Sequence, residues 1–197
     1  MQCNTKDHIE LENERVLLRP LTEADIIHLT PFSENEPELW DYSLTPGDGK
    51  ENLKNYVTTA LEKRAVGDSY PFIVYDKAVQ QYAGSTRFYD IQSQHETIQL
   101  GYTWYGKDFQ GTGLNKHCKF LMLQYAFETI GVTRVEFRAD ATNKRSIAAM
   151  KSIGCTPEGI LRSNCKSVSG RRDSIVLSIL KNEWFSHVKT ELKQKLS

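Results

Sequence analysis

The sequence predicts a mixed α/β fold, in which helices flank a mostly antiparallel sheet. Three strand-like segments, residues 70–76, 81–91 and 97–105, follow one another directly, and consecutive strands favour antiparallel pairing. A helical pattern joins the last of them to an alternating segment at 133–140, and such a β-α-β unit favours a parallel or splayed pair with a right-handed crossover. The predicted order is β-α-α-β-β-β-α-β-α-β.

The first third of the chain supplies one strand and two helices. Residues 15–21 predict a strand that ends at Pro20, and Thr22 then caps a helix with Asp25 in its first turn. A polar loop follows, which contains Pro31, Pro37 and Pro46. The next helix is predicted over 49–67, because its apolar residues recur at helical spacing: Leu53, Tyr56, Val57, Ala60 and Leu61.

The later elements alternate between helix and strand after a hairpin expected around 77–80. A helix over Leu114–Thr129 ends before Gly131 and carries one apolar face, made of Leu114, Cys118, Leu121 and Tyr125. The half-buried strand at 133–140 is followed by a helix at 143–154. Residues 172–185 begin as a strand and end as a helix, and the lysine-rich residues 188–197 are predicted to be a solvated helix end.

Composition narrows the class of protein. The chain has 197 residues with 25 basic and 25 acidic side chains, so a zero net charge argues against a broad nucleic-acid surface, although a local basic patch stays open. No apolar stretch reaches membrane-spanning length, and no signal peptide is evident. Because no C-x-x-C pair occurs, we expect reduced thiols of a cytoplasmic protein, with metal binding a poor second choice, at Cys3, Cys118, Cys155 and Cys165.

The turn Gln110-Gly111-Thr112-Gly113 separates the strand at 97–105 from the helix that starts at Leu114. A helix start exposes backbone N–H groups without partners and carries partial positive charge, so an anion can bind there. The P-loop pattern is absent because no G-K-[ST] follows, and the Rossmann pattern is absent because its third glycine is missing. From these residues alone, an anion site and a plain glycine-rich connection both remain open.

The segment Gln110–Asn115, "QGTGLN", resembles the Q/R-x-x-G-x-G/A signature of the GNAT acetyltransferase superfamily. In that family the turn holds the pyrophosphate of acetyl-coenzyme A (acetyl-CoA). Asn115 departs from the final Gly/Ala, so its side chain must point away. Residues 15–25, 125–162 and 171–184 resemble the branch that acetylates ribosomal-protein N-termini. The resemblance covers about residues 15–184, and we expect a single acetyltransferase domain over 1–197.

This resemblance implies a central sheet that is splayed into a V, with the pantetheine arm of acetyl-CoA lying in the opening. The arm pairs with strand backbone, for which the matching segment is "GYTWY". The side chains of Tyr102, Trp104 and Tyr105 are expected to pack rather than to bind, and no metal is expected. The implied cofactor-binding residues are Thr103, Trp104, Tyr105, Gln110, Gly111, Thr112, Gly113, Leu114, Asn115, Lys116 and Asn143.

Ser146 and Asn143 are the catalytic candidates. The resemblance implies that Ser146 donates a proton to the leaving thiolate and that Asn143 contacts the cofactor arm or an ordered water. The residue pattern agrees, since Asn143 is placed as a helix N-cap and Ser146 in the first turn, where the positive helix end favours a departing anion. A purely structural role is the alternative, in which Asn143 only caps the helix and Ser146 only bonds to backbone.

Three positions depart from the family. Met150 stands where many members have a proton-donating tyrosine, Cys165 where the branch has a water-holding carboxylate, and Gln99 where an acid often lies. These departures leave the general base unassigned. The carboxylates nearby in sequence, each expected to be a surface or structural group, are Glu158, Asp90 and Asp173.

We therefore expect an acetyl-CoA-dependent N-acetyltransferase whose acceptor is a primary amine, a protein N-terminal α-amine being one candidate. An α-amine has a pKa of about 8, so a weak base or water suffices to deprotonate it. A polyamine, amino acid or antibiotic is an alternative acceptor, and a non-catalytic acyl-CoA sensor is an alternative function; a homodimer stays open. The loop at 31–49 carries five acids, which either receive a cationic acceptor or, as we expect for most charged loops, are simply solvated: Glu34, Glu36, Glu38, Asp41 and Asp48.

Overall fold

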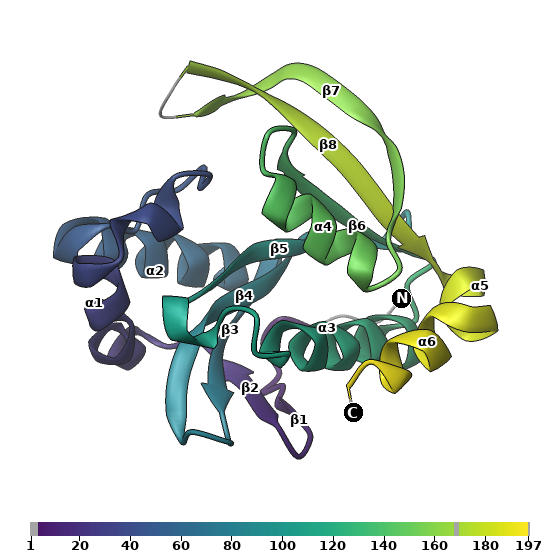
Figure 1. Cartoon of the computed structure of the whole chain (residues 1–197), viewed down its shortest axis with the longest axis horizontal. Coiled ribbons are helices and arrows are strands. Elements are labelled where there is room, and N and C mark those ends of the chain that lie inside the picture. The colour runs from purple at the N-terminus through teal and green to yellow at the C-terminus, as the bar shows by residue number, and fades with distance from the viewer. Residues whose placement is uncertain (1–3, 168–169, 197) are drawn as a thin grey trace.

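A mixed sheet lies at the centre of the computed structural model, which describes residues 4–167 and 170–196 (Figure 1). Within these residues the strand order is β1-β2-β3-β4-β5-β6-β8-β7, and only β5 and β6 pair in parallel. The predicted mostly antiparallel sheet is confirmed. The strands are β1 (Leu11–Glu12), β2 (Val16–Pro20), β3 (Ser69–Asp76), β4 (Gln81–Gln92), β5 (Thr97–Tyr105), β6 (Arg134–Asp140), β7 (Thr156–Ser167) and β8 (Gly170–Leu180).

Helices cover both faces of this sheet (Figure 1). On one face α1 (Ile26–Asn35) packs against α2 (Gly49–Ala65), which lies on β3. On the other face lies α3 (Leu114–Gln124), which continues as a π-helical turn to Ile130 and packs against α6 (Lys189–Gln194). The short helix α5 (Lys181–Glu183) precedes α6, and α4 (Lys144–Ser152) follows β6.

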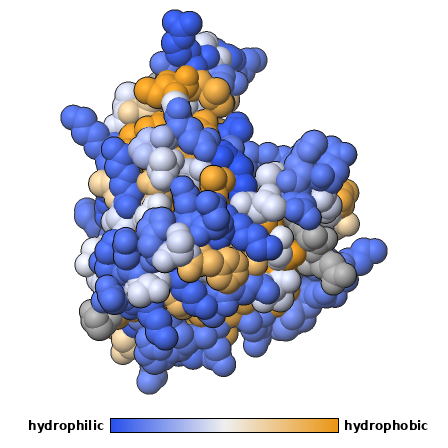
Figure 2. Space-filling view, turned by 90° about the vertical axis from the view of Figure 1, so that its right-hand side faces the viewer, coloured by the Kyte–Doolittle hydropathy of each residue, from blue (hydrophilic) through white to orange (hydrophobic). Residues whose placement is uncertain are grey.

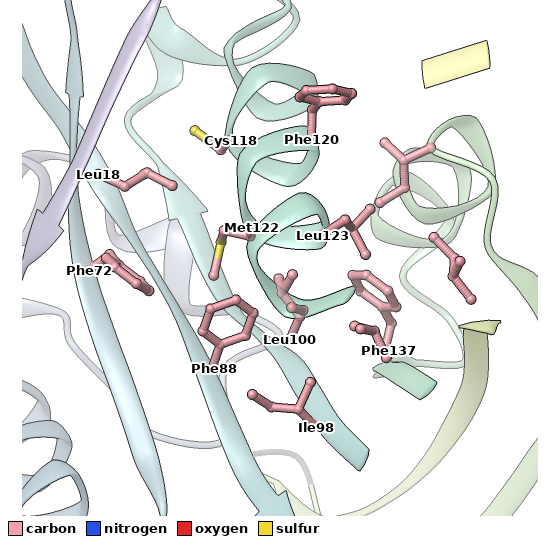
Figure 3. Close-up of a cluster of buried hydrophobic side chains, with 14 of the residues drawn as sticks. Leu18, Phe72, Phe88, Ile98, Leu100, Cys118, Phe120, Met122, Leu123 and Phe137 are labelled. Atoms are coloured by element: carbon pink, nitrogen blue, oxygen red, sulfur yellow. The ribbon is translucent and has the colours of Figure 1, made fainter. Parts of the chain in front are cut away.

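The alternation of side chains along each strand creates two hydrophobic cores. On β3, Phe72 and Val74 belong to the core on the α3 side, whereas Ile73 belongs to the core under α1 and α2. In Figure 3, Cys118 and Met122 of α3 point toward the sheet, where the side chains of Leu18, Phe72, Phe88, Ile98 and Leu100 gather. Of the predicted apolar face of this helix, Leu114 and Cys118 are fully buried and Leu121 and Tyr125 are partly buried against the core, whereas the fully buried Met122 was not predicted.

Helix α1 runs through Pro31, where the sequence predicted a loop. Pro31 has no N–H to donate to the carbonyl of Ile27, which normally ends a helix. Leu29 and Ser33 are nevertheless buried on this helix, and Ser33 Oγ donates to the carbonyl of Gly49 at 3.1 Å. Tertiary packing therefore outweighs the local cost of the proline.

Two strands, β1 and β7, were not predicted. β7 is exposed along almost its whole length and pairs only with β8, so it lacks the alternation of apolar and polar residues that marks a half-buried strand. The β7–β8 hairpin arches away from the rest of the sheet (Figure 1). Ile160 and Leu161 of β7 are exposed, and Figure 2 shows hydrophobic surface at the top of the molecule, where this hairpin lies.

Other expectations from composition can be compared with the described residues. Cys118, Cys155 and Cys165 are free thiols, and Cys3 lies outside the described part of the chain. Among residues 4–167 and 170–196, no helix has the length and apolar content needed to cross a membrane. The same residues contain no group of three or more His, Cys, Asp or Glu side chains arranged to hold a metal ion.

The C-terminal helices are docked, which corrects the prediction that residues 188–197 form a solvated helix end. Val188 and Leu192 are 2% and 1% exposed. Trp184 is fully buried, stacks on Phe127 with a centroid distance of 5.6 Å and donates from Nε1 to Glu128 at 2.9 Å. The lysines of this segment lie on its outer face, so its composition concealed a narrow apolar stripe.

Leu192→Ala should lower the free energy of unfolding by about 2–4 kcal/mol, because it leaves a cavity at a buried position of α6. Urea unfolding followed by circular dichroism measures the change. Lys193→Ala alters the exposed neighbour on the same helix and should leave the midpoint close to that of the unmodified protein. Equal midpoints for Leu192→Ala and Lys193→Ala would contradict the docking of α6.

Candidate active site

The parallel pair of β5 and β6 opens into a V. Residues 97–99 of β5 pair with residues 134–136 of β6. Beyond Gln99 the two strands separate, although β5 continues to Tyr105 and β6 to Asp140. In this opening, the backbone groups of β5 and β6 that face each other make no hydrogen bonds between the two strands, so an extended ligand can pair with them. The splayed sheet expected from the resemblance is confirmed.

A β-bulge distorts β5 beside this opening. The register between β4 and β5 shifts so that Tyr102 and Thr103 lie opposite Thr86 alone. Tyr102 takes a φ of 48°, in the left-handed region, which costs a residue with a Cβ about 1–2 kcal/mol. Backbone strain of this kind is common at functional sites and persists only where surrounding contacts hold it.

The side chain of Lys119, on α3, reaches the bulge and is 5% exposed. Its Nζ donates to Thr103 Oγ1 at 2.6 Å and to Thr86 Oγ1 at 3.2 Å, and it forms no ion pair with a carboxylate of the described chain. Burial lowers the pKa of Lys119 to about 7, against opposing effects of the Cys118 and Cys155 sulfurs. The sequence analysis missed this residue, because a lysine beside an apolar helical face is usually exposed.

The glycine turn leaves backbone donors free. Gly111 and Gly113 take φ values of 77° and 88°, and a Cβ at either position would meet nothing within 4 Å. Within the described chain the N–H groups of Gly111, Thr112 and Gly113 donate no hydrogen bond. Gln110 Nε2 donates to the carbonyl of Tyr105 at 2.6 Å, which ties the turn to the end of β5. The turn thus presents unpaired amides at the positive end of α3, as an anion site requires.

Gly111→Ala should weaken CoA binding about tenfold, because an alanine resists the left-handed φ and so displaces the free amides. Gly131→Ala is the matched control: its φ is 82°, a Cβ there also meets nothing within 4 Å, and it lies at the far end of the same helix. Both variants should lose similar stability. Titration calorimetry with CoA measures the difference, and equal affinity in the two variants would remove the turn from the cofactor site.

Asn143 and Ser146 lie at the start of α4, as predicted. Asn143 is the N-cap, and its Oδ1 accepts a hydrogen bond from the Ser146 backbone N–H at 3.0 Å. The Nδ2 group of Asn143 and the Oγ of Ser146 form no hydrogen bond with the described residues, and both residues line the cleft. The capping role and a ligand-binding role are therefore compatible, because they use different atoms.

A cleft of about 1200 Å³ connects these features. It runs along the glycine turn, β5, β6 and α4, and it extends to the loop after α1 and to the β7–β8 hairpin. Asn115 lies in it, and its Oδ1 accepts from Tyr105 Oη at 3.2 Å, so its side chain is turned toward β5. Of the residues implied by the resemblance, Thr112 and Leu114 do not line the cleft, whereas the lining includes Thr103, Trp104, Tyr105, Gln110, Gly111, Gly113, Asn115, Lys116, Asn143 and Ser146.

The three departures from the family pattern, Gln99, Met150 and Cys165, also line the cleft. Met150 is buried, and Cys165 Sγ lies 4.0 Å from the Ser174 hydroxyl. No tyrosine replaces Met150 on α4, which leaves Ser146 as the only hydroxyl in the first turn of this helix.

The carboxylates offered by the sequence separate into two groups. Arg134 binds Glu158, whose pKa falls to about 2 as a result, and Asp173 accepts from the backbone N–H of Ser163 at 2.6 Å. Neither Glu158 nor Asp173 lines the cleft. Asp90 does line it, although its position in the sequence gave no indication of this. Of the five acids in the loop at 31–49, only Glu38 lines the cleft.

A splayed strand pair, free amides at a helix start and a cleft that joins them define a class of protein that binds an extended anionic cofactor beside a second substrate. A family model described as "Acetyltransferase (GNAT) domain" matches residues 15–156. The chain belongs to this GNAT acetyltransferase family. It is an acetyl-CoA-dependent N-acetyltransferase.

Individual relatives agree with this assignment. The uncharacterised N-acetyltransferase p20 of Bacillus licheniformis is 23% identical over 175 residues, which are 88% of this chain and 97% of p20. YdaF of Bacillus subtilis (strain 168), named as a candidate ribosomal N-acetyltransferase, is 28% identical over 112 residues, 57% of this chain and 59% of YdaF. A GCN5-related N-acetyltransferase from Brucella melitensis has the same fold, with a TM-score of 0.89 at 24% identity over 98% of this chain and 87% of its own.

Proposed function

We propose that this chain transfers the acetyl group of acetyl-CoA to the α-amine of a peptide or protein N-terminus. The observation that carries the proposal is the cleft, which joins the free amides of the glycine turn to the diverging strands and then to the open face under the β7–β8 hairpin. Its volume of about 1200 Å³ exceeds that of most pockets for one small ligand, so it leaves room for a cofactor arm and a chain end together.

The proposed cofactor site follows the cleft residue by residue. The free amides of residues 111–113 would bind the pyrophosphate, and Gln110 would hold the turn against β5. The backbone of residues 103–105 would pair with the pantetheine arm, and Asn143 Nδ2 would donate to the same arm. Ser146 would return a proton to the thiolate of CoA as the acetyl group leaves.

An α-amine suits the groups that line the acceptor part of the cleft. Its pKa of about 8 leaves roughly a tenth of it neutral at pH 7, so a strong general base is unnecessary, whereas a lysine amine needs more help. The name of YdaF points to a similar acceptor. The acidic loop at 31–49 gives little support to a polyamine acceptor, because Glu34 pairs with Lys50, Glu36 accepts from the Lys107 N–H, and of the loop acids only Glu38 lines the cleft.

Mass spectrometry with three acceptor groups tests the proposal: peptides with a free N-terminus, the same peptides with a blocked N-terminus and an internal lysine, and spermidine. We expect acetylation at the α-nitrogen of the free peptides alone. Transfer only to spermidine or to lysine would refute the α-amine proposal, and CoA binding without transfer to any acceptor would favour a sensor. The homodimer, the cytoplasmic location and the single domain stay predictions from the sequence.

A further inference from the structure

Asp90 and Gln99 form a hydrogen-bonded pair inside the cleft, on two adjacent strands. Gln99 Nε2 donates to Asp90 Oδ2 at 2.6 Å, and Gln92 Nε2 donates to Asp90 Oδ1 at 2.6 Å. Asp90 takes a φ of 49° where the register of β4 and β5 shifts, which turns it out of the regular ladder. Two amides therefore fix the orientation of this carboxylate.

The carbonyl oxygen of the Gln99 side chain has no partner among the described residues, although Gln99 is only 7% exposed. An ionised carboxylate accepts hydrogen bonds and donates none, so Gln99 must turn its NH₂ group toward Asp90 and its Oε1 away from it. A buried acceptor left unpaired destabilises a fold unless a ligand or water completes it. Gln99 Oε1 is thus an acceptor in need of a donor.

The position of Gln99 places this acceptor at the apex of the V. Gln99 is the last residue of β5 that pairs with β6. Its neighbour Leu100 and the facing Phe88 belong to the core on the α3 side, so the pleat puts Gln99 and its partner Tyr89 on the opposite face. Met150 of α4 packs in the core on the α3 side, and the glycine turn begins α3. An acceptor that enters from the opposite face therefore meets Gln99 where the strands divide.

The charge of Asp90 is available to a ligand. Asp90 accepts from two neutral amides and forms no ion pair with any described residue. The nearby cation on β6, Arg138, is paired with Glu136 at 2.7 Å. Tyr89 also lines the cleft, and its ring meets that of Tyr102 edge to face, with the ring centroids 5.0 Å apart.

We propose that Asp90 and Gln99 bind the nitrogen of the acceptor as a primary ammonium ion, a role that rests on the acetyl-transfer function proposed above. The ammonium has three N–H donors, of which one satisfies the Asp90 carboxylate and one the unpaired Gln99 Oε1. The pair holds the nitrogen at the point where the strands open toward the thioester. The bound ammonium then loses its proton to water before it attacks.

Asp90→Asn tests this site while preserving its shape, since asparagine tolerates the left-handed backbone as well as aspartate does. We expect the KM for a peptide amine to rise about 10–100-fold, with the Kd for CoA unchanged. For an aromatic amine, which is neutral at pH 7.5, the KM should rise far less than for the peptide amine. Gln99→Met removes the amide at similar volume and should act in the same direction.

Glu38→Gln is the control, because Glu38 also lines the cleft but is exposed and paired at 3.4 Å with Lys107, which follows the far end of β5 from Gln99. It should leave the KM for both amines unchanged. A loss in Asp90→Asn that is equal for charged and neutral amines, or equal to that in Glu38→Gln, would overturn the proposal.

Titration of n-butylamine into the CoA-saturated protein separates this inference from the proposed function. If the protein transfers no acetyl group, the function fails, yet binding of n-butylamine that weakens in Asp90→Asn and persists in Glu38→Gln still supports the ammonium site. Absence of binding to the unmodified protein, or equal binding by both variants, overturns the site whether or not acetyl transfer occurs.

Discussion

Ser146→Ala should lower kcat about a hundredfold while it leaves the Kd for CoA within about twofold, because the hydroxyl acts only when the thiolate departs. The Ser146 Oγ makes no hydrogen bond with the described residues, so its removal breaks no fixed contact in the free protein. The backbone N–H of Ser146, which Asn143 caps at 3.0 Å, is retained by alanine. Steady-state kinetics and titration calorimetry give the two quantities separately.

Ser152→Ala provides the comparison on the same helix. Ser152 also lines the cleft, but its Oγ donates to the Ala149 carbonyl at 2.7 Å and lies at the far end of α4, away from the positive helix end. We expect it to retain kcat. If Ser146→Ala reduced kcat and CoA affinity by the same factor, Ser146 would be a binding residue; if it reduced neither, solvent would protonate the thiolate.

The parts of the fold that could be predicted are those with strong local signals. The helix α3 combined an apolar face at helical spacing with glycines at its start, and its N-terminus was placed at Leu114 correctly. Asn143 was recognised as the cap of α4 because asparagine accepts from the exposed N–H groups of a first turn. Each of these signals involves residues only a few positions apart, so a single sequence is enough to recognise it.

The parts that could not be predicted depend on distant partners. Asp90 joins the site through a hydrogen bond from Gln99 on the next strand, at a register shift that leaves no mark in the sequence. β7 has no buried face and so no apolar alternation in its sequence. Only its pairing with β8 identifies it as a strand. Leu192 is buried because α6 packs against α3, which is distant in the sequence. The lysines around Leu192 concealed this apolar position.

Lys119→Met should stabilise the protein at neutral and acidic pH, because Lys119 is buried against two threonine hydroxyls without a countercharge. Burial lowers its pKa in the folded state from 10.5 to about 7. Below pH 7 both the folded and the unfolded states are protonated, so the destabilisation is complete and constant. Between pH 7 and 10.5 only the unfolded state keeps the proton, so stability rises with pH; above 10.5 the penalty is gone.

The difference in stability between Lys119→Met and the unmodified protein should therefore shrink by roughly 3 kcal/mol between pH 7 and pH 9.5, as the linkage relation requires. Denaturant unfolding at pH 6.5, 8 and 9.5 measures this slope. The loss of the hydrogen bonds from Lys119 to Thr86 and Thr103 should change the free energy of unfolding by a similar amount at each pH. Lys54→Met replaces an exposed lysine of α2 and should show no such slope. A flat difference for Lys119→Met would mean that water or a rearranged side chain keeps Lys119 charged above pH 7, so that an ammonium would hold the bulge there as well.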